Sequence, residues 1–136
     1  MTQFFNSSQS DAVCRFEALA LAKRRASYRK GLLAEFLAGI ALSLRGYRIL
    51  ARRCKTRAGE IDLIAVRGNT VAFIEVKART TLADAQTSIT RRQSERMRRA
   101  ADVWIGRSPR YQNHEQRFDA VYVLPKRWPI HVIAGA

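Results

Sequence analysis

A stretch of 21 residues, 59–79, constrains the fold of this chain more than any other part of its sequence. It reads GEIDLIAVRGNTVAFIEVKAR, two apolar-rich runs separated by a turn at Gly68-Asn69. Such runs around a Gly- and Asn-containing turn are typical of an antiparallel hairpin. Apolar side chains fall on both faces of the two strands, so both faces need a cover. The stretch therefore predicts a central hairpin in a layered domain.

The turn also fixes which polar residues face one another across the hairpin. A centre at Gly68-Asn69 pairs Asp62 with Glu75, and Glu60 with Lys77, on one face. Directly opposed carboxylates repel, and a hard divalent cation such as Mg²⁺ would offset that repulsion. Asp62 and Glu75 are therefore candidate metal ligands. Lys77 lies beside them, where it could hold a water molecule or neutralise developing charge.

The same spacing has a plainer interpretation. Glu75 and Lys77 would form a solvated strand face, and Asp62 would protect a sheet edge against pairing with other chains. Apolar residues on both faces of the hairpin argue against this, because titratable groups on a covered sheet are candidates for function.

Hydrophobic periodicity and turn residues predict further elements around the hairpin. Two helices are expected before it, the first capped by Ser10 or Asp11 and the second ended by Gly46. A third helix, after the hairpin, carries arginines on its outer face, and the longest loop is expected over 106–116. The expected helices cover 11–26, 28–44 and 83–105, and the further strands cover 47–54, 117–124 and 129–133.

The chain is strongly basic outside the hairpin. Its 25 Lys and Arg residues against 11 Asp and Glu give a formal net charge of +14. Residues 23–57 carry a net +10 and residues 91–136 a net +6, whereas residues 58–90 carry −1. Arg supplies 20 of the 25 bases, which favours forked contacts with phosphate oxygens. A basic surface around a small acidic centre predicts a nucleic-acid partner and a metal, with a merely solvated surface or a membrane surface as alternatives.

Several other classes of protein are disfavoured by what the sequence lacks. The longest apolar runs fall short of the ~18 residues of a membrane span, and the N-terminus does not read as a secretory signal. No membrane partner and a cytoplasmic location are therefore expected. No glycine-rich phosphate loop appears, so no nucleotide cofactor is expected. Cys14 and Cys54 are expected to be structural thiols, His114 and His131 surface residues, and Trp104 and Trp128 core or sheet anchors.

Three motifs of the chain, GEIDLIA, FIEVKAR and a later RFD strand, resemble the YraN-like family of predicted endonucleases. That family looks like a branch of the PD-(D/E)XK nuclease superfamily and is similar to archaeal Holliday-junction resolvases. The resemblance covers about residues 28–124. It implies an α/β fold with a restriction-endonuclease-like core, a mixed sheet with a central antiparallel hairpin flanked by helices. Residues 28–136 would form a single nuclease-like domain, and residues 1–27 an N-terminal helical extension without an assigned role.

The resemblance also implies a role for each polar residue of the hairpin. Asp62 and Glu75 become ligands of Mg²⁺, with Mn²⁺ as a substitute, and the backbone carbonyl of Val76 becomes a further ligand. Lys77 becomes the residue that assists the attacking water.

Glu35 is the candidate site residue that lies farthest from the hairpin in the sequence. It matches the acid that the family carries in its first core helix, and it is expected to support the catalytic site. The alternative is an ion pair on the helix surface with Lys30 or Arg45.

The basic residues after the hairpin are expected to hold the nucleic-acid backbone. Relatives often carry Lys before Gln in the helix after the hairpin, where this chain has Arg before Gln, so a phosphate contact is expected there rather than a catalytic role. Arg79 and Arg117 are also expected to bind phosphate, or else to pair with Asp84 or Asp119. The expected nucleic-acid-binding residues are Arg79, Arg91, Arg92, Gln93, Arg99 and Arg117.

Together these expectations describe a small Mg²⁺-dependent endonuclease that hydrolyses phosphodiesters of duplex, branched or junction DNA. The alternative is a non-catalytic binder of structured DNA or RNA with the same basic surface. The sequence leaves open whether two copies pair as a homodimer and whether the site needs a partner protein.

Overall fold

The computed structural model describes residues 7–133, with their side chains from residue 12 onward. The chain divides into two units, residues 1–32 and residues 33–136. The described part of the first unit is helical, and the second unit contains the sheet. The domain boundary predicted after residue 27 falls inside the first unit.

Helix α1 spans Ser7–Leu44, where the sequence predicts two helices over 11–26 and 28–44. The predicted break between the two helices is wrong. Residue 27, where the break was expected, is a serine. Serine lowers helix propensity only slightly, and it has neither the ring of proline nor the backbone freedom of glycine. The backbone hydrogen bonds of the helix therefore continue through this position.

The two ends of α1 differ in how well they were predicted. The helix begins at Ser7, before the predicted cap at Ser10 or Asp11. It ends as predicted, because Gly46 has a φ of 88°, in the left-handed region that favours glycine after a helix.

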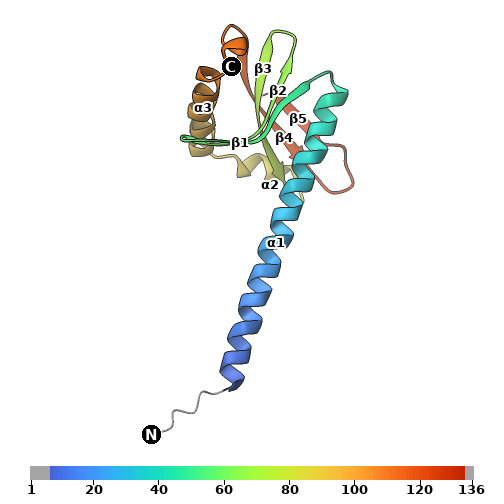
Figure 1. The fold of residues 1–136 in the computed structure, drawn as a ribbon. Coiled ribbons are helices and arrows are strands. Elements are labelled where there is room, and N and C mark those ends of the chain that lie inside the picture. Colours follow the sequence, from blue (N-terminus) through green and yellow to red (C-terminus); the bar gives the residue numbers. More distant parts are fainter. Residues whose placement is uncertain (1–6, 134–136) are drawn as a thin grey trace. The chain divides into compact units, whose positions relative to one another are not determined.

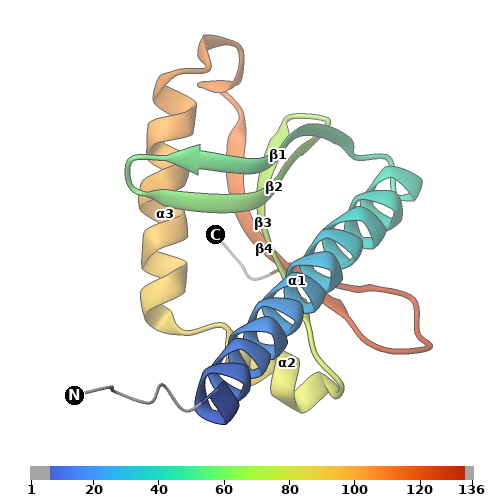
Figure 2. The same ribbon diagram turned by 60° about the horizontal axis from the view of Figure 1, so that its bottom comes forward.

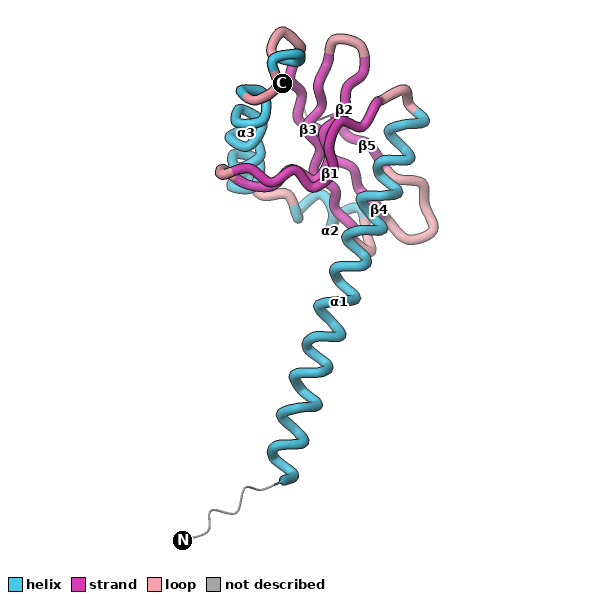
Figure 3. Tube along the Cα trace, in the orientation of Figure 1, coloured by secondary structure: helices cyan, strands magenta, loops and turns pink. Residues whose placement is uncertain are grey.

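Five strands form one mixed sheet in the order β1-β2-β3-β4-β5 (Figures 1 and 3). Neighbouring strands are antiparallel except for β3 and β4, which are parallel. The hairpin and the three further strands are confirmed close to their predicted positions. The strands span β1 Arg48–Thr56, β2 Gly59–Arg67, β3 Thr70–Ala78, β4 Glu115–Val123 and β5 Ile130–Ile133.

The parallel pairing of β3 and β4 requires a crossover, which α2 (Leu82–Ser88) and α3 (Arg91–Gly106) provide. The prediction of one helix over 83–105 is wrong at Thr90. The Thr90 hydroxyl accepts a hydrogen bond from the Gln93 N–H, and the Gln93 side chain accepts one from the Thr90 N–H. This capping box starts a new helix, and its Thr-x-x-Gln spacing is legible in the sequence. The short helix η1 (Pro109–Tyr111) lies within the predicted loop.

Apolar residues pack on both faces of the sheet, as the hairpin predicts. Ala38 and Leu42 of α1 cover one face, and Met97 and Ala101 of α3 cover the other. Figure 2 shows α3 and the C-terminal end of α1 on either side of the strands. The result is a mixed α/β fold with a five-stranded sheet flanked by helices, compatible with a restriction-endonuclease-like core.

The remaining predictions about single residues have mixed outcomes. Trp104 packs edge to face on Phe73, with ring centroids 5.9 Å apart, which confirms it as a core anchor. Trp128 is 57% exposed, so the same prediction is wrong for it. Cys14 and Cys54 are both free thiols. Within residues 7–133, no helix has the length and apolar character that crossing a bilayer requires.

Candidate active site

The hairpin of β2 and β3 has the predicted register over most of its length. Its pairs run from the turn up to Leu63 opposite Ile74, and stop one pair before Asp62 and Glu75 would meet. The two carboxylates therefore lie where β2 and β3 separate, rather than as a paired rung of the ladder.

Glu60 lies beyond this separation. It pairs with Lys55, because β2 stays paired with β1 down to Gly59 after it has left β3. The prediction that Glu60 faces Lys77 is therefore wrong. A third strand competes for the end of β2, and the hairpin alone gives no sign of that competition.

Where the backbone pairing of β2 and β3 ends, the Asp62 carboxylate makes the hydrogen bond to β3 instead. Its Oδ2 atom accepts a hydrogen bond from the Val76 N–H at 2.8 Å. The N–H and C=O of one strand residue point toward the same neighbouring strand, so the Val76 carbonyl is also directed toward Asp62. The structure thus brings the two predicted metal-binding groups, the Asp62 carboxylate and the Val76 carbonyl, to one place.

The charge of Asp62 is only partly compensated by its surroundings. Burial raises the pKa of Asp62 to about 6, and the hydrogen bond from Val76 offsets only part of this effect. The negative charges of Glu75 and Glu35 raise the pKa further, and the positive charge of Lys77 lowers it. A cation bound next to such a carboxylate would stabilise its charged form.

Glu75 and Lys77 share one face of β3, as predicted. The Glu75 Oε1 and Lys77 Nζ atoms are 3.0 Å apart, and these side chains are only 18% and 15% exposed. Low exposure weakens the screening of this ion pair by water. The fold therefore holds an ammonium group directly beside the Glu75 carboxylate and near Asp62.

Glu35 is held by a residue of β1, outside the hairpin. Its Oε2 atom lies 2.7 Å from the Nε atom of Arg53, and its side chain is 14% exposed. The alternative partners, Lys30 and Arg45, are not the observed ones. Glu35 lies close enough to Asp62 to raise its pKa, which places it at the edge of the site rather than outside it.

Sequence reasoning missed Arg53, which is the residue that holds Glu35. Arg53 lies on β1 between the pairs Arg52–Leu63 and Cys54–Ile61, at the level of Asp62. Its φ is 48°, in the left-handed region that non-glycine residues rarely adopt. Such backbone outliers are found preferentially at functional sites. Nothing in the local sequence indicates this conformation.

The donor atoms of the site suit a weakly held hard cation. Within the described part of the chain, no three or more His, Cys, Asp and Glu residues cluster to hold a metal ion. The available donors are the carboxylates of Asp62 and Glu75 and the Val76 carbonyl. Mg²⁺ is commonly bound by one or two carboxylates together with water and substrate phosphate. These residues therefore fit Mg²⁺ or Mn²⁺ bound together with a phosphate group.

The basic residues predicted on α3 and at the end of β3 are exposed. Arg91 forms an exposed ion pair with Glu95 at 3.6 Å, and the Arg79 Nη1 atom donates to the Ala78 carbonyl at 2.7 Å. The Gln93 side chain is used by the cap of α3. Their contact with nucleic acid stays a prediction. The exposed members of the set are Arg79, Arg91, Arg92 and Arg99.

Arg117 lies on the face of the sheet opposite to Glu75. It stands level with Ala72, which packs on the α1 face. Its guanidinium makes two hydrogen bonds of 2.8 Å to Asp119 and a third to the Tyr47 hydroxyl. The alternative prediction, a pair with Asp119, is therefore confirmed, and a phosphate contact of Arg117 stays a prediction.

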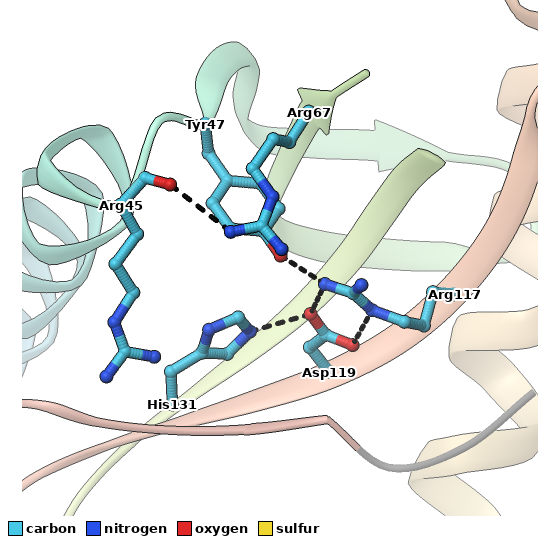
Figure 4. Close-up of polar contacts among 6 residues, drawn as sticks. All are labelled: Arg45, Tyr47, Arg67, Arg117, Asp119 and His131. Atoms are coloured by element: carbon cyan, nitrogen blue, oxygen red, sulfur yellow. Dashed lines mark hydrogen bonds and ion pairs between the residues drawn. The ribbon is translucent and has the colours of Figure 1, made fainter. Parts of the chain in front are cut away.

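Asp119 is the centre of a buried polar cluster (Figure 4). Besides the bonds from Arg117, it contacts the His131 Nε2 atom at 2.7 Å. Burial alone would raise the pKa of Asp119, but the hydrogen bonds from His131 and Arg117 outweigh it and lower the pKa. The His131 side chain is 4% exposed, so its prediction as a surface residue is wrong. The Arg67 guanidinium lies over the Tyr47 ring, 4.5 Å from its centroid, and closes the cluster.

Comparisons with known proteins agree on one family. Residues 34–123, about two thirds of the chain, match the uncharacterised protein family UPF0102. A UPF0102 protein of Chelativorans sp. (strain BNC1) is 52% identical over 115 residues, which cover 85% of this chain and 93% of that protein. One from Mesorhizobium japonicum is 53% identical over 111 residues, covering 82% and 89%. One from Brucella canis is 49% identical over 112 residues, also covering 82% and 89%.

Proposed function

The chain belongs to the UPF0102 family, and we propose that it is a divalent-metal-dependent endonuclease that hydrolyses phosphodiesters of DNA. One observation carries the proposal. Two carboxylates, Asp62 and Glu75, lie near each other where β2 and β3 separate, with the Lys77 ammonium 3.0 Å from Glu75. Burial, more than the acidic neighbours, raises the pKa of Asp62 to about 6, so its charged form is disfavoured inside the protein. A cation bound with a substrate phosphate would stabilise that charged form.

Each residue of the site has a distinct role in this proposal. Asp62, Glu75 and the Val76 carbonyl would hold Mg²⁺, or Mn²⁺ in its place, which supplies Lewis-acid stabilisation and an activated water. Lys77 has three N–H donors and no acceptor, so it can orient the attacking water and neutralise charge that develops on the phosphate. Glu35, fixed by Arg53, adds negative charge that favours a cation near Asp62.

Binding of the DNA backbone is assigned to three exposed arginines of α3, Arg91, Arg92 and Arg99. Replacing Arg91, Arg92 and Arg99 together by Ala should weaken DNA binding and flatten its salt dependence, by about one unit of slope for each phosphate that the variant no longer binds. The measurement is the dissociation constant at several NaCl concentrations by fluorescence anisotropy. An unchanged slope would place the DNA on another surface.

A cleavage assay tests the activity itself. Labelled four-way junction, linear duplex and single-stranded DNA are incubated with the full chain in Mg²⁺, in Mn²⁺ and in chelator. We expect metal-dependent products from the wild type and none from Lys77→Ala. The preferred substrate then shows whether branched DNA is favoured. Analytical ultracentrifugation of the same samples shows whether two copies pair as a homodimer on the DNA.

A non-catalytic binder of structured DNA or RNA is the second candidate. The observation that favours it is the Glu75–Lys77 ion pair, which is complete without a metal. This function predicts salt-sensitive binding without products, and binding that is unchanged or tighter in Asp62→Asn and Glu75→Gln, since both variants reduce repulsion of phosphate. Products that require metal and Lys77 would exclude it.

A further inference from the structure

A pocket of about 240 Å³ lies beside Glu75, and the proposed hydrolysis does not use it. It lies on the α3 face of the sheet, between β3, β4 and the two crossover helices. Its volume is below the range of about 300–1,000 Å³ typical of sites for drug-sized ligands. The pocket is therefore suited to a single planar ring system rather than to a complete nucleotide. Glu75, Gln86, Ser94, Arg98, Phe118 and Tyr122 are among the residues that line it.

The Arg98 guanidinium and the Phe118 ring both line this pocket. The central carbon of the Arg98 guanidinium lies 4.9 Å from the centroid of the Phe118 ring. Phe118 in turn stacks on Phe73, with centroids 5.6 Å apart and planes inclined by 27°. Guanidinium planes and aromatic rings are the surfaces on which proteins stack unpaired nucleobases.

The polar groups of the pocket have unused hydrogen-bonding capacity. Within residues 7–133, the side chains of Gln86, Ser94 and Arg98 make no hydrogen bond or ion pair with another residue. Together they offer donors from all three side chains and acceptors from Gln86 and Ser94. A nucleobase edge presents a matching mixture of donors and acceptors.

The charged groups that line the pocket have both signs. Glu75 and Arg98 both line it, so a neutral base is compatible with its lining. The phosphate of the same strand would lie next to the pocket, where Asp62 and Glu75 would hold the metal. The pocket and the candidate metal site therefore match two neighbouring parts of one strand.

We propose that this pocket receives a single nucleobase, rotated out of its stack, next to the phosphate that the metal site would hold. This inference rests on the proposed function, because the metal site supplies the position of the phosphate. Extruding a paired base costs free energy, and the cost is least where the base is mismatched or already unpaired. The pocket therefore favours DNA that is unpaired at the cut.

The first test uses mononucleotides and does not depend on cleavage. Amide resonances of the ¹⁵N-labelled full chain are followed by NMR during titration with TMP, dCMP, dAMP or dGMP in Mg²⁺, and with 2-deoxyribose 5-phosphate as the baseless control. We expect shifts at Ser94, Arg98 and Phe118 with at least one mononucleotide and not with the sugar phosphate. Equal shifts with the sugar phosphate, or shifts confined to residues outside the pocket, would overturn the proposal.

A matched pair of variants sharpens this test. Arg98→Ala removes the stacking plane and should weaken mononucleotide binding about fivefold or more. Arg96→Ala removes the same charge from the same exposed helix but from a residue that does not line the pocket, so it should leave that affinity unchanged. An equal loss in both variants would indicate general electrostatics instead of a base site.

A second test separates this inference from the proposed function. One abasic residue is moved stepwise along a short single strand, and both binding and cleavage are measured. The proposal predicts one position where losing the base weakens binding about 5- to 150-fold. If such a position is found but the DNA is not cleaved, the base-pocket proposal is supported and the nuclease proposal is contradicted. If the DNA is cleaved but no position weakens binding, the base-pocket proposal is overturned and the nuclease proposal stands.

Discussion

Two aspartates of this domain, Asp62 and Asp119, are shielded from water and are treated in opposite ways by their surroundings. Asp119 accepts hydrogen bonds from Arg117 and His131, and its pKa is lowered. Asp62 accepts one hydrogen bond from the backbone, and burial, followed by the charges of Glu75 and Glu35, raises its pKa to about 6. The charge of Asp119 is thus compensated by protein groups, whereas the charge of Asp62 is only partly compensated.

The difference separates an aspartate that supports the structure from one that is suited to a ligand. The charge of Asp119 is satisfied by protein groups alone, so removing it should damage the fold. The charge of Asp62 costs stability in the absence of a cation, and sites of this kind are usually retained for function. Single substitutions can test both halves of this comparison.

The largest expected effect is on activity. Asp62→Asn keeps the acceptor for the Val76 N–H but removes the charge that would bind the cation. Losing several kcal/mol of transition-state stabilisation should slow cleavage by about a thousandfold. The measurement is the single-turnover rate on the best substrate in Mg²⁺. Asp84→Asn, the same chemical change at an exposed acid of α2, should cleave normally. Normal cleavage by Asp62→Asn would remove Asp62 from the site.

The next effect is on the fold. Asp119→Ala leaves the partly buried guanidinium of Arg117 without its carboxylate partner, and removing one partner of a buried pair costs about 3–5 kcal/mol. Urea unfolding followed by circular dichroism, in chelator, measures the change. Asp102→Ala, at an exposed position of α3, should lie within about 0.5 kcal/mol of the wild type. Equal stability of the two variants would show that the buried cluster does not support the fold.

The raised pKa of Asp62 should make the stability of the domain depend on pH. The folded pKa of Asp62, about 6, exceeds its ordinary value of 3.8. The folded state therefore binds the proton more tightly, and that stabilisation is full below pH 3.8 and is lost as pH rises through 6. In chelator, Asp62→Asn should match the wild type near pH 4 and exceed it by about 1–3 kcal/mol at pH 8. A constant difference between the two proteins across this range would contradict the raised pKa.

The smallest effect concerns the cation itself. Mg²⁺ at ten times its dissociation constant should stabilise the wild type by about 1.4 kcal/mol at pH 8. It should not stabilise Asp62→Asn, whereas Asp84→Asn should respond like the wild type. Thermal unfolding with and without Mg²⁺ measures the difference. Equal stabilisation of Asp62→Asn would place the cation elsewhere.

Local chemistry explains what the sequence predicts well. The Gly68-Asn69 turn sets the hairpin register by itself, and Gly46 ends α1 because few other residues adopt its conformation. The Thr90 cap is of the same local kind, and applying the capping-box pattern would have separated α2 from α3. These features depend on residues within a few positions of one another.

Features that depend on distant partners could not be predicted in this way. The end of the β2–β3 ladder at Leu63 depends on where β1 pairs, and the ion pair of Glu35 depends on the backbone of Arg53. The burial of His131 depends on the register of β5 against β4. The hairpin pattern therefore predicted that Asp62 and Glu75 lie near each other, while their exact neighbours required the fold.

The antiparallel order of β1, β2 and β3 has a consequence for how the domain folds. Arg53, Asp62, Glu75 and Lys77 all lie on this continuous meander, whose contacts close only short loops. The Asp119 cluster instead joins residues from the start of β1 to β5, and it needs the parallel β3–β4 pairing across the whole crossover. Distant pairings are slow because a long loop must first be closed. The acidic centre is thus expected to assemble early in folding, and the cluster that stabilises the finished domain to assemble last.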